Sequence, residues 1–291
     1  MFVLGIKGGA MEKVHVVQWN DIQFGEPGSD PNDHFFRYRV LAEGDSWFSL
    51  RGIPSSNLLF QMKLPRTTIV VNMGSPGATI SKMAEIAADS ELGKAMSSLH
   101  GYKWHAILLS GGGNDLIDDA DLIIRKPSRY TDPADCCDEN ELMKTLDRVE
   151  AGYRTIVELR DQAGSSCKGK PILTHTYDYV TPRNSPSRFL FMPLKGPWLY
   201  TALKNAGIQT RYWNDVSDYL LFSLAERIES LATGPDKLPA FHVVNTINTL
   251  VPAELGATHD SNDWIDEIHP NSDGYKKIAS KLAKKLAKVL P

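Results

Sequence analysis

The chain has 291 residues, of which 42% are hydrophobic and 23% charged, and its formal net charge is −3. This composition is that of an ordinary globular protein, so it excludes disordered, collagen-like and disulfide-stapled chains. The balance of 32 Lys and Arg against 35 Asp and Glu excludes binding of nucleic acid or an anionic membrane by the surface as a whole. The length allows one large α/β domain or two smaller domains.

No apolar stretch approaches the roughly 20 residues that a membrane helix needs, so we expect no stable membrane anchor. Residues 1–10 lack the basic start and small-residue cleavage site of a secretory signal, which favours a cytoplasmic protein. Three cysteines cannot all pair within the chain, and the adjacent Cys136 and Cys137 are too close for an ordinary disulfide. We expect these two in a loop, with a redox role as the alternative.

Five short segments rich in β-branched and other apolar residues predict strands. They are residues 36–42, 67–72, 105–110, 171–177 and 241–245. Apolar residues recur at helical spacing in residues 83–99, 139–161 and 215–233 and in a stripe from Tyr275 to Val289. Strands that alternate with helices predict a mostly parallel sheet with helices on both faces.

Two segments interrupt this alternation. Residues 115–140 contain many acidic residues and two prolines, and residues 181–197 are rich in Pro, Arg and aromatic residues. Both follow a predicted strand, and ligands of open parallel sheets bind beyond the carboxyl ends of the strands. We therefore expect these segments to form substrate walls, the alternative being surface insertions without a role in binding.

The first predicted strand runs into a turn that contains Gly44, Asp45 and Ser46. A serine at the carboxyl end of a strand can act as a nucleophile, although this tripeptide is also ordinary turn or helix-cap chemistry. The next two strands run into glycine-rich segments, residues 72–79 and 110–115. Glycines expose backbone N–H groups, and the amide of Asn114 adds a donor, as a developing oxyanion requires. Neither segment matches a phosphate-binding loop, so nucleotide binding is not expected.

Asp266 and His269 stand three residues apart, just before the last helix. At this spacing the carboxylate can accept a hydrogen bond from one imidazole nitrogen, which leaves the other free to take a proton from a serine. Nearby acidic and histidine residues allow a metal site as the alternative, but they lack a recognised ligand spacing. These residues are His259, Asp260, Asp263 and Glu267.

Taken in this order, each at a strand exit, the four segments resemble the SGNH hydrolases, a branch of the GDSL esterase/lipase superfamily. The resemblance spans residues 41–291. It implies a three-layer α/β/α sandwich of flavodoxin type with a five-stranded parallel sheet, and hydrolysis of acyl esters without a metal or other cofactor. Residues 36–291 would form this domain, and residues 1–35 an extension of unknown role. Trp47 and Phe48 depart from the family in placing bulk after the serine, which affects the expected width of the pocket.

The resemblance also implies a role for each site residue. Ser46 is the expected nucleophile, His269 the base and Asp266 the residue that orients it. Ser46, Gly77 and Asn114 are the expected oxyanion donors, Gly74 being the second choice for the glycine.

The sequence thus favours a serine esterase that works through an acyl-enzyme on a small-molecule, lipid or carbohydrate ester. An acyltransferase on the same scaffold and a carbohydrate- or lipid-binding pseudoenzyme are the alternatives. Aromatic and apolar residues after the fourth strand predict a substrate wall, formed by Phe189, Phe191, Met192 and Trp198. Basic residues there predict a positive rim, formed by Arg183, Arg188 or Lys195. The lysines of the last helix allow a membrane-surface role as an alternative to ordinary packing.

Overall fold

Parallel strands form the centre of the molecule. A computed structural model describes residues 11–49, 57–87, 91–100, 102–189 and 192–291. Within these residues the main sheet has six strands in the spatial order β10-β7-β6-β3-β5-β2. The strands are β2 His15–Gln18, β3 Tyr38–Gly44, β5 Thr68–Asn72, β6 Ala106–Ser110, β7 Ile172–His175 and β10 Phe241–Val244. All five neighbouring pairs are parallel.

Five of these strands coincide with the predicted ones, but the expected count of five is too low by one. The additional strand is β2, which pairs with β5 from His15 opposite Ile69 to Gln18 opposite Asn72. It has only four residues and buries only Val17, so its hydrophobic pattern is too short to stand out. The other five strands follow the order second, first, third, fourth, fifth, which is the flavodoxin-like order.

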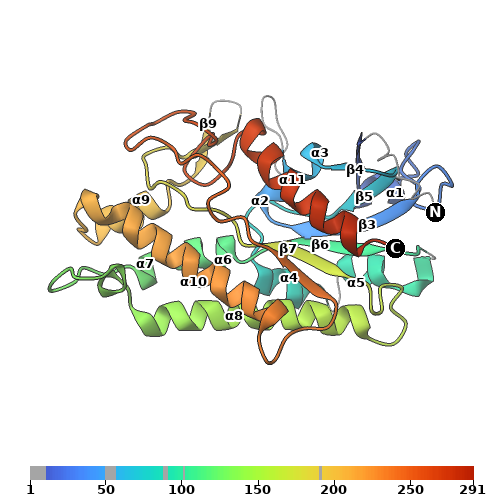
Figure 1. The fold of residues 1–291 in the computed structure, drawn as a ribbon, viewed down its shortest axis with the longest axis horizontal. Helices are drawn as coiled ribbons and strands as arrows, with labels where there is room; N and C mark the ends of the chain where they lie inside the picture. Colours follow the sequence, from blue (N-terminus) through green and yellow to red (C-terminus); the bar gives the residue numbers. More distant parts are fainter. Residues whose placement is uncertain (1–10, 50–56, 88–90, 101, 190–191) are drawn as a thin grey trace, which may run out of the picture.

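Helices cover both faces of the sheet, which makes three layers (Figure 1). One face carries α4 Ile80–Ala87, α8 Glu139–Asp161 and α10 Trp213–Thr233, and the other carries α11 Ser272–Val289. The prediction for residues 139–161 matches α8, and α10 begins two residues before its predicted start. Of the helix predicted over residues 83–99, the structure describes α4 and α5 Glu91–Met96, and residues 88–90 between them lie outside the described residues. The prediction starts three residues too late and ends three residues too late.

Short elements complete the described part of the chain. The short helices are α1 Trp19–Gln23, α2 Ser46–Ser49, α3 Leu58–Gln61, α6 Gly113–Asp118, α7 Ala120–Ile123 and α9 Leu199–Asn205. Single 3-10 turns occupy Ser98–His100, Pro133–Cys136 and Thr210–Tyr212. Two antiparallel pairs lie outside the main sheet, β1 Glu12–Lys13 with β4 Lys63–Leu64 and β8 Ser187–Phe189 with β9 Met192–Lys195.

The core lies between the sheet and its helices. Every residue of β5 and of β6 is buried, as expected for strands of a parallel sheet that is covered on both faces. On the other face, α11 buries the apolar stripe from Tyr275 to Leu286 against the protein and leaves most of its lysines exposed. Packing within the protein therefore accounts for the apolar stripe of α11. Within the described residues, no helix has the length and apolar character needed to cross a bilayer.

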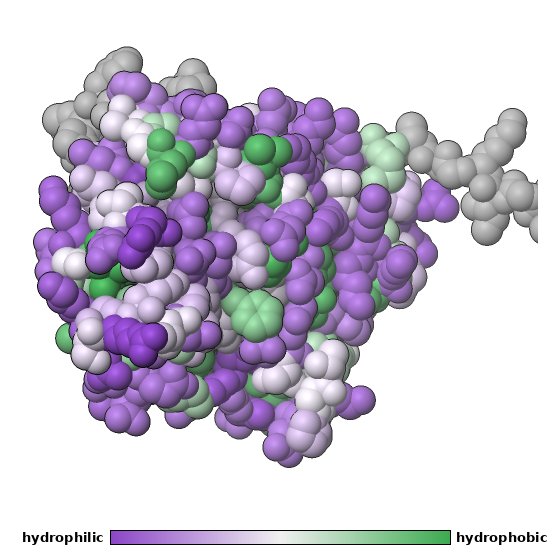
Figure 2. All heavy atoms as spheres, turned by 60° about the vertical axis from the view of Figure 1, so that its left-hand side comes forward, coloured by the Kyte–Doolittle hydropathy of each residue, from purple (hydrophilic) through white to green (hydrophobic). Residues whose placement is uncertain are grey.

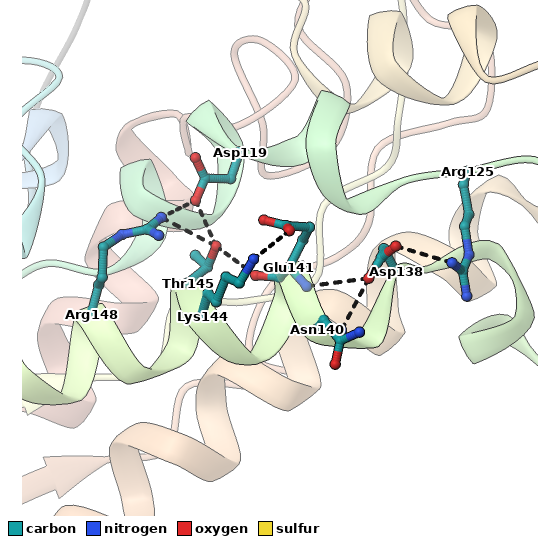
Figure 3. A network of polar contacts seen from close by, with 8 residues as sticks. All are labelled: Asp119, Arg125, Asp138, Asn140, Glu141, Lys144, Thr145 and Arg148. Atoms are coloured by element: carbon teal, nitrogen blue, oxygen red, sulfur yellow. Dashed lines mark hydrogen bonds and ion pairs between the residues drawn. The ribbon is translucent and has the colours of Figure 1, made fainter.

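Acidic side chains attach the predicted insertion at residues 115–140 to the start of α8 (Figure 3). Asp138 caps α8 by accepting from the backbone N–H groups of Asn140 and Glu141, and it also pairs with Arg125 at 3.0 Å. Asp119 accepts from the Thr145 hydroxyl at 2.5 Å and pairs with Arg148. These contacts fix the segment that follows α6.

The three cysteines are buried free thiols. Burial raises the pKa of the Cys137 and Cys167 thiols to about 12, so both stay protonated at neutral pH. A protonated, buried thiol is a poor nucleophile.

The end of the molecule that carries α7 and α9 shows mainly hydrophilic side chains with apolar ones scattered between them (Figure 2).

Candidate active site

Ser46 stands at the point where the central strand β3 passes into the short helix α2. Strands β3 and β6 approach closely just before the serine, where a Cβ at Gly44 would lie 2.8 Å from the Cβ of Ser110. Only glycine fits there without a shift of the neighbouring strand. The serine is therefore held at the carboxyl edge of the sheet, where it is 7% exposed.

The side chains of Ser46, His269 and Asp266 form one hydrogen-bonded chain. Nε2 of His269 lies 2.8 Å from Oγ of Ser46, and Nδ1 lies 2.8 Å and 3.0 Å from the two carboxylate oxygens of Asp266. Since an ionised carboxylate only accepts, Nδ1 carries the hydrogen and Nε2 is left to accept from the serine hydroxyl. The backbone N–H groups of Ile268 and His269 also donate to Asp266, at 3.0 Å and 2.8 Å, and they fix its orientation.

The environment of His269 sets its proton affinity. Burial disfavours the imidazolium, but the charge of Asp266 and its hydrogen bond, together with the charge of Asp45, offset this effect. The net result is a pKa of His269 above its ordinary value. A more basic imidazole is a better acceptor for the serine proton.

Buried side chains hold the loop that carries Asp266 and His269. The guanidinium of Arg183 donates to the carbonyl oxygens of Asp266 at 2.6 Å and His259 at 2.5 Å. Arg183 is only 1% exposed, so its predicted place on a positive rim is wrong. Its charge is used inside the protein, on backbone carbonyls.

Glu267 connects the same loop to helix α9. Its carboxylate accepts from the backbone N–H of Tyr200 at 2.7 Å and from that of Trp198. Burial raises the pKa of Glu267 to about 7, against the effect of these hydrogen bonds. Asp263 is also engaged, with the backbone of Val251 at 2.6 Å and with Lys277 at 2.5 Å. Among the described residues no group of three or more possible metal ligands occurs.

Trp47 and Phe48, which follow the serine, point into the core. Phe48 is fully buried. The Trp47 indole donates to the carbonyl of Ile268 at 3.2 Å and stacks on His175 with 5.2 Å between ring centroids. Trp47 therefore attaches the serine turn to the histidine loop, and part of it reaches the pocket beside Ser46.

Asn114 and Ser46 line the same pocket. The Asn114 amide donates to the carbonyl of Ala78 at 3.0 Å, and an amide nitrogen has a second hydrogen for another acceptor. The bond to Ala78 joins residues 36 positions apart, so it is not the local bond of a tight turn. It fixes the amide beside the serine.

The two candidate glycines differ. Gly77 lies in the turn before Ala78 with a φ of +74°, a conformation that a side chain disfavours, and it does not line the pocket. The N–H of Gly74 is engaged by the side chain of Asn72 at 2.9 Å. Because of this bond, the backbone N–H of Gly74 is not free to donate to an oxyanion.

A buried polar network lies beneath the serine, and sequence reasoning did not find it. The carboxylate of Asp45 accepts from the Tyr177 hydroxyl at 2.5 Å, the Ser110 hydroxyl at 2.8 Å and the backbone N–H of Trp47 at 3.0 Å. Ser110 in turn accepts from Nε2 of His175 at 3.0 Å, since Nδ1 of His175 accepts from the backbone of Tyr177. Burial lowers the pKa of His175 to about 3 and raises that of Asp45 to about 6.

Apolar side chains form one side of the pocket beside Ser46. They come from α6, the segment after β7, α9 and α10, and they are Leu116, Ile117, Val180, Leu199 and Leu221. None of them was among the residues predicted to form the substrate wall. Among the predicted wall residues, Trp198 lies with its ring centroid 6.1 Å from that of His269. Phe191 and the side chains of Phe189, Met192, Arg188 and Lys195 lie outside what the structure describes.

Comparison with known proteins identifies a family and several similar folds. The family model of the GDSL-like lipases and acylhydrolases matches residues 49–282, which begin just after Ser46 and include Asn114, Asp266 and His269. A lipase from a goat rumen metagenome has a similar fold, with a TM-score of 0.53 and 14% identity over 87% of this chain and 98% of that one.

Two further solved structures are less similar. A putative acylhydrolase from Bacteroides fragilis gives a TM-score of 0.45 at 15% identity, over 92% of this chain and 93% of that one. An acetylxylan esterase from Geobacillus stearothermophilus gives 0.43 at 16% identity, over 86% and 94%. None of the curated proteins compared with this chain matches it.

The family match covers well over half of the chain, and the chain belongs to the GDSL-like lipase/acylhydrolase family. It is therefore a serine hydrolase of the GDSL type. The resemblance inferred from four short segments and the expected class of fold are both confirmed.

Proposed function

We propose that this protein is an esterase that hydrolyses an acyl ester through an acyl-enzyme on Ser46. The observation that carries the proposal is the chain of 2.8 Å contacts from Ser46 through His269 to Asp266. An alcohol is a weak nucleophile until a neighbouring base takes its proton, and a buried imidazole held by a carboxylate is suited to that task.

In the first half of the reaction, Oγ of Ser46 attacks the ester carbonyl carbon while its proton passes to Nε2 of His269. The negative charge that develops on the carbonyl oxygen is stabilised by the N–H of Ser46 and the amide of Asn114, which line the same pocket, and the family resemblance adds the N–H of Gly77 as a third donor. When the tetrahedral intermediate collapses, the bond to the alcohol oxygen breaks and His269 protonates that oxygen. The alcohol leaves, and the acyl group stays on Ser46.

In the second half, water takes the place of the alcohol. Nε2 of His269 accepts a proton from the water as its oxygen attacks the acyl-enzyme, and the same donors stabilise the second oxyanion. Collapse breaks the bond to Ser46, which regains its proton from His269. Asp266 remains ionised throughout and stabilises the imidazolium. Residues of this chain hold and move every proton in the cycle.

The test is a panel of acyl esters in which release of the free acid is measured for the wild-type protein and for Ser46→Ala. We expect turnover by the wild type and a loss of at least about 10⁴-fold in Ser46→Ala, as for removal of a nucleophile that acts with its base as a unit. Acid release that is undiminished in Ser46→Ala would contradict the proposal. Formation of a new ester when an alcohol is added, in place of free acid, would indicate an acyltransferase on the same site.

A further inference from the structure

Two regions adjoin Ser46, the pocket on the one hand and the side chains of His269 and Trp198 on the other, and they assign the two halves of the substrate. Its lining includes Ser46 and Asn114 and extends to apolar side chains of α6, α9 and α10, but it does not include His269. His269, which contacts the Ser46 hydroxyl through Nε2, lies outside this lining, and the ring centroid of Trp198 lies 6.1 Å from that of its imidazole.

The reaction geometry decides which half of the ester enters the pocket. The alcohol oxygen must approach Nε2 of His269, because that atom protonates it as it leaves. The carbonyl oxygen must face the Asn114 amide and the Ser46 N–H. The remaining substituent of the carbonyl carbon, which is the acyl chain, is then directed into the pocket, whose lining does not include His269.

Two buried carboxylates, those of Asp45 and Asp178, also line the pocket, but hydrogen bonds within the protein engage them. The carboxylate of Asp178 accepts four backbone N–H bonds of 2.7–2.8 Å, from residues 179 and 248–250. The carboxylate of Asp45 accepts three hydrogen bonds within the protein. The four acceptor positions of Asp178 are thus occupied, as are three of the four of Asp45, so these carboxylates offer little to a polar acyl chain.

The pocket is also small. Its volume is only about 30 Å³, well below the few hundred cubic ångströms of an ordinary small-molecule site. Leu116, Leu199 and Leu221 are each at most 4% exposed and come from three different helices. Because these side chains belong to the packed core, the pocket cannot lengthen without displacing them.

We infer that the apolar part of this pocket is the acyl site, that it selects short apolar acyl chains of about two to four carbons, and that Leu221 limits their length. The inference rests on the proposed esterase function. The alcohol half of the substrate would then lie on the side of His269 and Trp198.

The experiment measures kcat/KM on p-nitrophenyl esters with acyl chains of two, four, six and eight carbons. We expect the wild-type protein to lose at least about tenfold between four and eight carbons, since one methylene in an apolar pocket changes rates by roughly 10- to 200-fold. Leu221→Ala should raise the ratio of eight-carbon to two-carbon activity by about tenfold or more, and Leu221→Phe should lower the four-carbon rate relative to the two-carbon rate.

A matched control is Leu231→Ala, which truncates another buried leucine of α10 outside the pocket lining. It should lower the melting temperature without changing the chain-length profile. A second series fixes a two-carbon acyl group and varies the alcohol. Leu221→Ala should leave that profile unchanged, whereas Trp198→Ala should alter it.

The outcomes separate the two proposals. If the folded wild-type protein turns over no ester and Ser46 is not acylated, the esterase function itself fails. If it turns over esters but prefers the longest acyl chains, or if Leu221→Ala changes only the alcohol profile, the function stands and the assignment of the acyl site is overturned.

Discussion

The hydroxyl of Tyr177 donates a 2.5 Å hydrogen bond to the carboxylate of Asp45, the residue directly before Ser46. Tyr177 adopts a φ of +62°, which is unfavourable for a bulky side chain and is found mainly where the surroundings enforce it. Its ring also fills the space above Gly113, where a Cβ would lie 2.9 Å from a ring carbon. One residue thus links the serine turn to the helix that carries Asn114.

Replacing Tyr177 with phenylalanine keeps the ring and removes the hydroxyl. We expect kcat to fall by roughly tenfold with little change in KM, because the serine turn and the oxyanion donors lose a shared support that acts in the transition state. Steady-state kinetics on a short-chain ester provide the measurement. Tyr275→Phe is the control, since the buried hydroxyl of Tyr275 has no hydrogen-bond partner among the residues that the structure describes. Equal kinetics for both variants would remove the positioning role of Tyr177.

Asn114→Ala separates an oxyanion donor from a structural residue. A donor that acts on charge present only in the tetrahedral state should, when removed, lower kcat by about 10²- to 10³-fold and leave KM nearly unchanged. Kinetics and thermal unfolding are measured on the same samples. A kcat close to that of the wild type, together with a clearly lower melting temperature, would limit Asn114 to its bond with Ala78.

The raised pKa of His269 predicts the pH dependence of the rate. The base must be neutral to accept the serine proton, so kcat/KM should fall as the pH drops through a pKa above the ordinary 6.5. In Asp266→Asn the charge that stabilises the imidazolium is lost, and this acid limb should move to lower pH while kcat falls less than in His269→Ala. A limb that stays in place in Asp266→Asn would show that another group controls it.

Glu267 predicts a pH dependence of stability. Its pKa is raised from 4.5 to about 7 in the folded protein, so the folded state binds this proton more tightly than the unfolded state does. Its contribution to the free energy of unfolding is full below pH 4.5 and declines by about 3 kcal/mol as the pH rises through 7. Denaturant unfolding at several pH values should give a flatter curve for Glu267→Gln than for the wild type. Parallel curves would contradict this source of the pH dependence.

The sequence predicted those features that a local pattern encodes. Asp266 and His269 are three residues apart, and Ser46 and Asn114 each follow a predicted strand, so the topology alone brings them to one edge of the sheet. The buried strands β5 and β6 are rich in apolar residues and were predicted closely for the same reason.

Features assembled from distant segments were missed. Leu116, Val180 and Leu221 share a pocket only because α6, the segment after β7 and α10 pack together, and each occupies an ordinary core position in its own segment. The buried position of Arg183 was missed for the same reason, because the carbonyl groups that bind it lie more than 70 residues away in the sequence. Strand β2 is defined by its pairing with β5 rather than by its own four residues.

The most direct test of the central claim is to find the residue that carries the acyl group. The wild-type protein is treated with a small alkyl fluorophosphonate, and the modified residue is located by peptide mass analysis. We expect one adduct, on Ser46, which is strongly reduced in His269→Ala and absent in Ser46→Ala, together with loss of esterase activity in proportion to labelling. An adduct on a different residue, or full esterase activity in protein completely labelled at Ser46, would contradict the central claim.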